Sequence, residues 1–126
     1  MPAESVKDRP TRAHEYIFLF SKSKEYFYDH QAAREPANSH GRSRNRRSVW
    51  AINTEAFPDA HFATFPPTLV EPCLAAGTAV GDRVIDPFFG SGTVGEVCVG
   101  MQRAFTGIEL NEEYAQLARR RLGWEV

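Results

Sequence analysis

The stretch VIDPFFGSGTVGEVC, residues 84–98, decides how the rest of this chain is interpreted. A short apolar run stops at Asp86, and a proline, two phenylalanines and a glycine-rich run follow before an amphipathic segment. Gly90, Gly92 and Gly95 fit the pattern G-x-G-x-x-G, in which glycine lets the backbone turn sharply and approach a ligand closely. The stretch therefore predicts a strand, a tight glycine loop and a helix.

Regular elements surround this loop in the sequence. DRVID at 82–86 and RAFTGIEL at 103–110 predict two short strands. PPTLVEPCLAAGT at 66–78 predicts a helix that begins after a proline. NEEYAQLARRRL at 111–122 predicts a helix with Asn111 as its cap, acidic residues in its first turn and arginines in its last. The order helix, strand, helix, strand, helix is half of a doubly wound α/β sheet.

The segment before residue 61 divides into two zones. Aromatic and β-branched residues at 16–20 and 26–28 flank a polar turn, so residues 1–30 are expected to hold a β-hairpin. Residues 31–60 are polar and are expected to form a basic loop. Four arginines lie there within six positions: Arg42, Arg44, Arg46 and Arg47. Such a run is typical of a solvated loop and also of a segment that contacts DNA phosphates, and both interpretations remain open.

Length and composition limit the remaining choices. With 126 residues, the chain is expected to be a single domain, 1–126, of which 61–126 form the α/β unit. The net charge of −1 gives no global attraction to nucleic acid or membrane. Two isolated cysteines and no signal peptide predict a cytoplasmic protein without a metal site. No apolar run approaches the ~20 residues needed to span a bilayer, so no membrane partner is expected.

The glycine pattern by itself suggests a dinucleotide, but its context favours another ligand. In dinucleotide sites the pyrophosphate lies at the helix N-terminus, where glycine follows the strand directly. Here DPFF intervenes, and the Asp86 carboxylate would repel a diphosphate but attract an ammonium group. Glu109 follows Gly90 by nineteen positions and ends the next strand, where it can accept hydrogen bonds from both ribose hydroxyls. A ribose, an ammonium group and no phosphate describe S-adenosylmethionine, the predicted cofactor; a fragment of an NAD-dependent oxidoreductase is the less favoured alternative.

Three motifs carry a family resemblance. DPFFGSGT at 86–93 resembles motif I of the DNA amino-methyltransferases, which methylate the exocyclic nitrogen of adenine or cytosine. GIELNEEYAQLARRRL at 107–122 resembles their second motif, and HFATFPPTLVEPCLAAGT at 61–78 resembles motif X. Motif X running directly into motif I is the arrangement of the circularly permuted β class, and residues 8–29 resemble the segment that follows its catalytic half. The resemblance implies a bacterial, archaeal or phage restriction-modification enzyme that acts on double-stranded DNA, with a partial Rossmann-like sheet of the class I methyltransferase type.

The same resemblance implies a set of cofactor contacts. Asp86 would face the methionine amino group, Glu109 would hold the ribose, and Leu110 would pack near the adenine. The backbones of Gly90 and Gly92 are expected to be exposed toward a cleft. The pocket would be lined by Pro87, Phe88, Phe89, Gly90, Ser91, Gly92 and Thr93 from the loop and by Thr64, Phe65 and Pro66 from motif X. The two phenylalanines could instead be ordinary core residues.

The catalytic motif of the resembled family is missing. Motif IV is Asp-Pro-Pro-Tyr or Ser-Pro-Pro-Tyr, which binds the target amino group and stacks on the flipped base. The only adjacent proline pair is Pro66-Pro67, which belongs to motif X, so no catalytic residue is assigned. The chain is expected to be the C-terminal part of a longer enzyme, without its central strands and inactive alone. The other interpretation is a non-catalytic module that docks to a separate polypeptide carrying motif IV.

Overall fold

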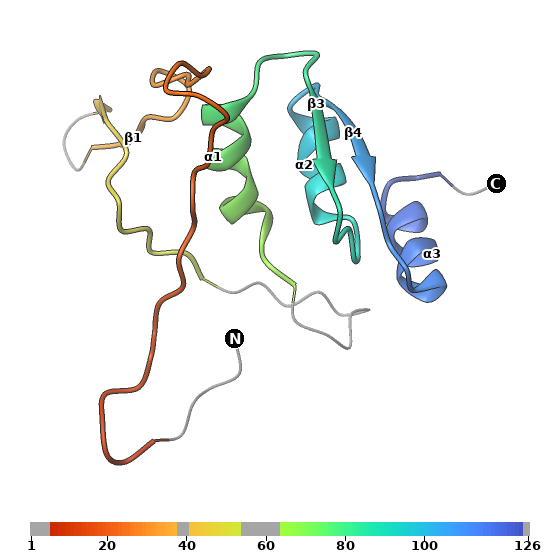
Figure 1. The fold of residues 1–126 in the computed structure, drawn as a ribbon, viewed down its shortest axis with the longest axis horizontal. Coiled ribbons are helices and arrows are strands. Elements are labelled where there is room, and N and C mark those ends of the chain that lie inside the picture. Colours follow the sequence, from red (N-terminus) through yellow and green to blue (C-terminus); the bar gives the residue numbers. More distant parts are fainter. Residues whose placement is uncertain (1–5, 38–40, 54–63, 125–126) are drawn as a thin grey trace.

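The computed structural model describes residues 6–37, 41–53 and 64–124, and its elements form two groups (Figure 1). The first group is a short antiparallel pair and the second is an α/β unit. In chain order the elements are β1 (Glu35–Pro36), β2 (Ser43–Arg44), α1 (Pro67–Gly77), β3 (Arg83–Asp86), α2 (Thr93–Gly100), β4 (Ala104–Gly107) and α3 (Glu112–Arg121). The predicted order of helix, strand, helix, strand and helix is confirmed.

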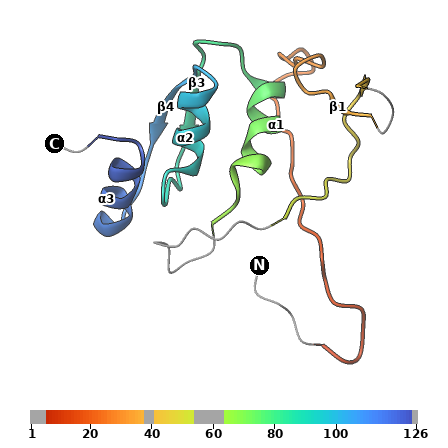
Figure 2. The same ribbon diagram turned by 180° about the vertical axis from the view of Figure 1, so that it is seen from behind.

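The α/β unit is built on one parallel strand pair. β3 and β4 run in register, with Val84 opposite Phe105. Helices α1 and α2 lie side by side against one face of this pair (Figures 1 and 2). The core between them is formed by Val70, Leu74, Val97 and the fully buried Cys98, with Val84 and Phe105 packed against it. The carboxyl ends of both strands and the amino ends of α1, α2 and α3 lie at the same end of the unit (Figure 1). In open α/β sheets, this is the end at which ligands bind.

Local chemistry explains where the helices begin. The Asn111 side chain accepts a hydrogen bond of 2.9 Å from the Glu113 N–H, as a cap residue does. The first turn of α3 is acidic and its last turn holds three arginines, which complements the helix dipole. Pro67 opens α1, where its missing N–H would have no helical partner in any case.

Two glycines make room for an aromatic stack. The Phe89, Phe105 and Trp124 rings follow one another with centroid distances of 5.5 and 5.2 Å. A Cβ on Gly95 would lie 2.7 Å from the Phe89 ring and 2.9 Å from the Phe105 ring, and one on Gly107 would also meet Phe89. Gly95 therefore weakens α2 as a helix but is required for its close approach to the stack.

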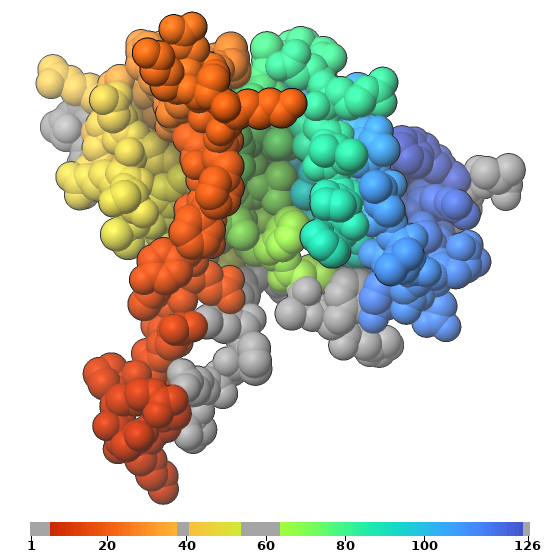
Figure 3. All heavy atoms as spheres, viewed as in Figure 1, coloured from red at the N-terminus to blue at the C-terminus, as the bar shows by residue number. Residues whose placement is uncertain are grey.

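The predicted N-terminal β-hairpin is wrong. Within the described part of the chain, residues 16–20 and 26–28 form no strands. Tyr16, Phe18 and Phe20 follow one another on one side of an extended backbone, with ring centroids 6.0 and 5.9 Å apart. The large apolar residues of both stretches are between 46% and 84% exposed, and the segment lies across the surface of the molecule (Figure 3). A strand needs a hydrogen-bonded neighbour, and the described residues provide none for this segment.

The basic zone is not wholly a loop. β1 and β2 form an antiparallel ladder that pairs Glu35 with Arg44. The Arg34 guanidinium reinforces it by donating to the Ser43 hydroxyl at 2.8 Å and to the Asn45 side chain at 3.0 Å. The last residues of this zone, 54–60, and the first three of the expected motif X, 61–63, lie outside the described residues.

Two negative observations concern the described residues alone. Among them, no helix is both long and apolar enough to cross a membrane. The same residues hold no group of three or more side chains that could bind a metal ion.

Candidate cofactor-binding site

The turn between β3 and α2 has the predicted form. β3 ends at Asp86, whose carboxylate accepts a hydrogen bond of 2.9 Å from the Phe88 N–H and so starts the turn. Gly90 and Gly92 have φ angles of 53° and 84°, in the left-handed region that favours glycine. The chain then enters α2 at Thr93. The predicted strand, glycine loop and helix are thus confirmed.

Glu109 joins the two strand ends. One carboxylate oxygen accepts a hydrogen bond of 2.7 Å from the Gly90 N–H, nineteen residues away, and the other accepts one of 2.8 Å from the Asn111 N–H. These backbone donors, that of Asn111 first, hold the pKa of Glu109 below its ordinary value. The carboxylate is therefore ionised at neutral pH, and each oxygen keeps a further lone pair for a ligand.

The two glycines of the loop differ in their surroundings. Gly92 is buried, its N–H donates to the Phe89 carbonyl, and a Cβ there would lie 3.0 Å from the Ala118 Cβ. The expectation that the Gly92 backbone faces a cleft is therefore wrong, because α3 packs against that side of the loop. Gly90 is half-buried beside Glu109, so its surroundings are those of the carboxylate.

The hydroxyls of the loop face the protein. Ser91 and Thr93 are 3% and 5% exposed, and both accept hydrogen bonds from the Arg121 guanidinium. Nothing in the sequence pointed to this contact, since the arginines that end α3 were explained by the helix dipole alone. Their spacing on the helix carries no information about which one reaches the loop.

The apolar residues expected to line the pocket divide into exposed and packed ones. Phe88 is 87% exposed and Leu110 fully exposed, so neither belongs to the core of the described residues. Phe89 is half-buried in the aromatic stack, which supports the core interpretation for that ring. From motif X, Thr64 is half-buried and Phe65 exposed. Pro66 is buried and caps α1, whose amino end lies at the same end of the unit as the glycine loop (Figure 1).

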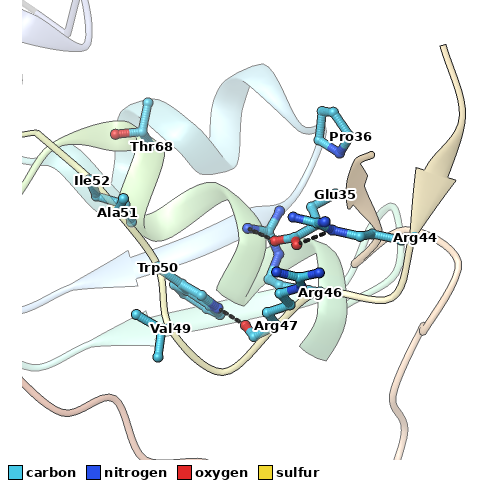
Figure 4. Close-up of a pocket in the computed structure, with 10 residues that line it drawn as sticks. All are labelled: Glu35, Pro36, Arg44, Arg46, Arg47, Val49, Trp50, Ala51, Ile52 and Thr68. Atoms are coloured by element: carbon cyan, nitrogen blue, oxygen red, sulfur yellow. Dashed lines mark hydrogen bonds and ion pairs between the residues drawn. The ribbon is translucent and has the colours of Figure 1, made fainter. Parts of the chain in front are cut away.

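The basic zone lines a separate, open cavity of about 540 Å³ (Figure 4). Arg44 donates to the Glu35 carboxylate at 2.8 Å, and this hydrogen bond is the main cause of a lowered Glu35 pKa. Arg46 lies 4.0 Å from the same carboxylate, and its guanidinium lies 5.2 Å from the centre of the Trp50 ring. Arg47 also lines the cavity, and its carbonyl accepts a hydrogen bond of 2.6 Å from the Trp50 indole.

The four predicted DNA-binding arginines therefore differ. Arg44 and Arg46 are half-buried, and both interact with Glu35. The structure gives both of them a role in holding the β1–β2 pair together. Arg42 and Arg47 are exposed.

A family profile described as DNA methylase matches residues 2–120. The chain belongs to this family. Among curated relatives, the type II methyltransferase M.XycI of Xanthomonas campestris pv. cyanopsidis is 63% identical over 119 residues, which cover 94% of this chain and 39% of that protein. The type II methyltransferase M.Cfr9I of Citrobacter freundii is 57% identical, over 97% of this chain and 40% of that protein. This DNA methylase chain thus spans about 40% of the length of the curated relatives it matches.

Solved structures support the fold of the methylase unit. The crystal structure of the M1.HpyAVI–SAM complex matches 80% of this chain and 45% of that chain, with a TM-score of 0.57 and 30% identity. A DNA modification methylase from Thermus thermophilus matches 64% of this chain and 32% of that chain, with a TM-score of 0.52 and 36% identity. The α/β unit is therefore part of the Rossmann-like methyltransferase fold, as the sequence predicted.

Proposed function

We propose that this chain binds S-adenosylmethionine at the carboxyl end of β3 and β4 and forms the donor-binding part of a DNA amino-methyltransferase. Its target would be the exocyclic amino group of adenine or cytosine in double-stranded DNA. The observation that carries the proposal is the Glu109 carboxylate, held ionised between the N–H groups of Gly90 and Asn111. A fixed carboxylate at the end of the second strand suits the two hydroxyls of a ribose.

The other residues at this end fit the remaining parts of the cofactor. The Asp86 carboxylate accepts one backbone hydrogen bond and has further lone pairs for an ammonium group. Leu110 and Phe88 are exposed apolar side chains beside the strand ends, suited to the adenine ring. When bound, S-adenosylmethionine supplies an electrophilic methyl group on its sulfonium. The part of these residues is to bind and orient the donor.

We propose that methyl transfer requires a second polypeptide that carries motif IV. The sequence contains no Asp-Pro-Pro-Tyr or Ser-Pro-Pro-Tyr to hold a target base. Two apolar surfaces support the need for a partner. Ile85 on β3 is 66% exposed, and the segment at 16–20 carries large apolar side chains on both of its faces. A strand with this pattern is typical of the interior of a sheet.

We propose that the basic zone contributes DNA affinity through Arg42 and Arg47. Both side chains are exposed, whereas Arg44 and Arg46 interact with Glu35. Contacts of this kind act on phosphates and carry no sequence information by themselves.

Calorimetric titration of the chain with S-adenosylmethionine, and separately with NAD, tests the proposed cofactor. We expect saturable binding of S-adenosylmethionine and none of NAD at the same concentrations. Binding of NAD alone would favour the oxidoreductase alternative. Binding of neither would contradict the proposal, provided that amide exchange shows the α/β unit to be folded.

A further inference from the structure

We propose that Arg121 is a positioning residue, which fixes the shape of the glycine loop that receives the cofactor. The inference rests on the proposed binding of S-adenosylmethionine. Arg121 is the last residue of α3 and reaches back to the loop, 28 and 30 residues after its two hydroxyl acceptors.

The Arg121 guanidinium contacts both the loop and the helix that follows it. One nitrogen donates to the Thr93 hydroxyl at 3.0 Å and to the Ser91 hydroxyl at 3.3 Å. The other nitrogen forms a hydrogen-bonded ion pair with the Glu96 carboxylate on α2. A single planar cation therefore links the end of α3 to the beginning of α2.

Burial makes these contacts matter. The Arg121 side chain is only 13% exposed, and the two hydroxyl residues are nearly inaccessible. Hydrogen bonds from a charged donor are stronger than neutral ones, and a buried hydroxyl that loses its donor is left with an unmet acceptor. Replacing Arg121 by an apolar residue should therefore loosen the loop at Ser91 and Thr93.

The loop is thus held at two points. Glu109 fixes Gly90 by its N–H, and Arg121 fixes the two hydroxyls that lie on either side of Gly92. With both hydroxyls bonded to Arg121, the ligand is left with the loop backbone near Gly90 and the strand-end carboxylates. Arg121 would then act on the cofactor through the loop, without touching it.

The test compares Arg121→Met, Arg121→Lys and the matched control Arg120→Met. Arg120 precedes Arg121 on the same helix and is exposed. Amide hydrogen exchange is read at Gly92 and Glu96, whose N–H groups are bonded within the loop and the start of α2. Exchange at Ala104 and Ile108, bonded along the strand pair, reports the stability of the whole unit. The dissociation constant of S-adenosylmethionine is measured by calorimetry for each variant.

We expect Arg121→Met to speed exchange at Gly92 and Glu96 while Ala104 and Ile108 stay protected, and to weaken cofactor binding about tenfold. Arg121→Lys should recover part of both effects, and Arg120→Met should show neither. Unchanged loop exchange in Arg121→Met would overturn the inference, as would faster exchange at all four amides alike, which indicates a purely structural role. If the unaltered chain binds no S-adenosylmethionine, the proposed function fails, while the exchange data still decide whether Arg121 positions the loop.

Discussion

Glu109 is the residue whose chemistry bears most directly on cofactor binding. Replacing Glu109 with alanine removes the charged acceptor for the ribose and also the partner of the Gly90 N–H. We expect Glu109→Ala to weaken S-adenosylmethionine binding by ~1.5–3 kcal/mol, the usual range for hydrogen bonds to a charged group. Calorimetric dissociation constants of the variant and the unaltered chain measure the loss.

Glu112→Ala is the matched control, because Glu112 lies three positions later in the exposed first turn of α3. It pairs only loosely with Arg119, at 3.7 Å. Its removal should change affinity little, since exposed ion pairs contribute at most about 1 kcal/mol to stability. Equal affinities of the two variants would count against the ribose role of Glu109.

Single residues also mark the limit of what the sequence could predict. Glu109 was predictable because its place at a strand end depends on spacing and on a common strand-loop-helix pattern. The contact of Arg121 with the loop was not, because it joins residues about 30 positions apart through the packing of α3. The burial of Gly92 escaped prediction for the same reason, since Ala118 on α3 covers it.

At the scale of elements, the basic zone separates structural arginines from exposed ones. We expect Arg42→Ala/Arg47→Ala to lower the slope of log affinity for DNA against log salt by roughly 2, near 0.9 for each lost phosphate contact. Fluorescence anisotropy with labelled duplex DNA at several salt concentrations measures the slope. The control pair is Arg44→Ala/Arg46→Ala, which should mainly loosen the β1–β2 pair. An unchanged slope for the first variant would mean that the exposed arginines belong to an ordinary solvated loop.

The β1–β2 pair should also respond to acid. The hydrogen bond from Arg44 holds the pKa of Glu35 below its ordinary value, so the ionised carboxylate adds stability above that ordinary pKa, about 4.3. This contribution is lost as the pH falls through the lowered folded-state pKa. Carbon NMR of the Glu35 carboxyl group should give a midpoint below that ordinary pKa, and the midpoint should rise in Arg44→Gln. A midpoint that is the same in both proteins would show that Arg44 does not stabilise the ionised form.

Elements differed in how well their sequence predicted them. The three helices and two parallel strands were predicted because caps, dipole residues and glycine positions act locally. The N-terminal strands at 16–20 and 26–28 were not realised, because strand formation depends on a neighbouring strand. Their apolar side chains agree with a place inside a sheet, and the described residues do not supply that sheet.

For the whole molecule, we expect no methyl transfer to DNA by the chain alone. It has residues suited to a donor but no recognisable group for a flipped base. Holding two reacting groups close and in line supplies on the order of 7–11 kcal/mol of such barriers, so binding the donor alone gives little rate. The assay is transfer of tritiated methyl groups from S-adenosylmethionine to unmethylated DNA, with chain purified from a host that lacks its own methyltransferases.

A polypeptide that carries motif IV is the complementary reagent in this assay. Its addition should produce methyl transfer if the two chains form one sheet, and Glu109→Ala in this chain should then reduce the rate. Clear turnover by the unaltered chain alone would contradict the need for a second polypeptide. Some other segment would then hold the target base, and the loop at 64–67 is the first to examine.

The most direct test of cofactor binding at the strand ends is an NMR titration of the ¹⁵N-labelled chain with S-adenosylmethionine. We expect the largest amide shifts at Gly90, Leu110 and Asn111, which surround the Glu109 carboxylate. The indole N–H of Trp50, in the basic cavity, should not move. Shifts centred on that cavity, or no shift at Gly90 at a saturating concentration, would contradict the claim that the glycine loop and Glu109 hold the cofactor.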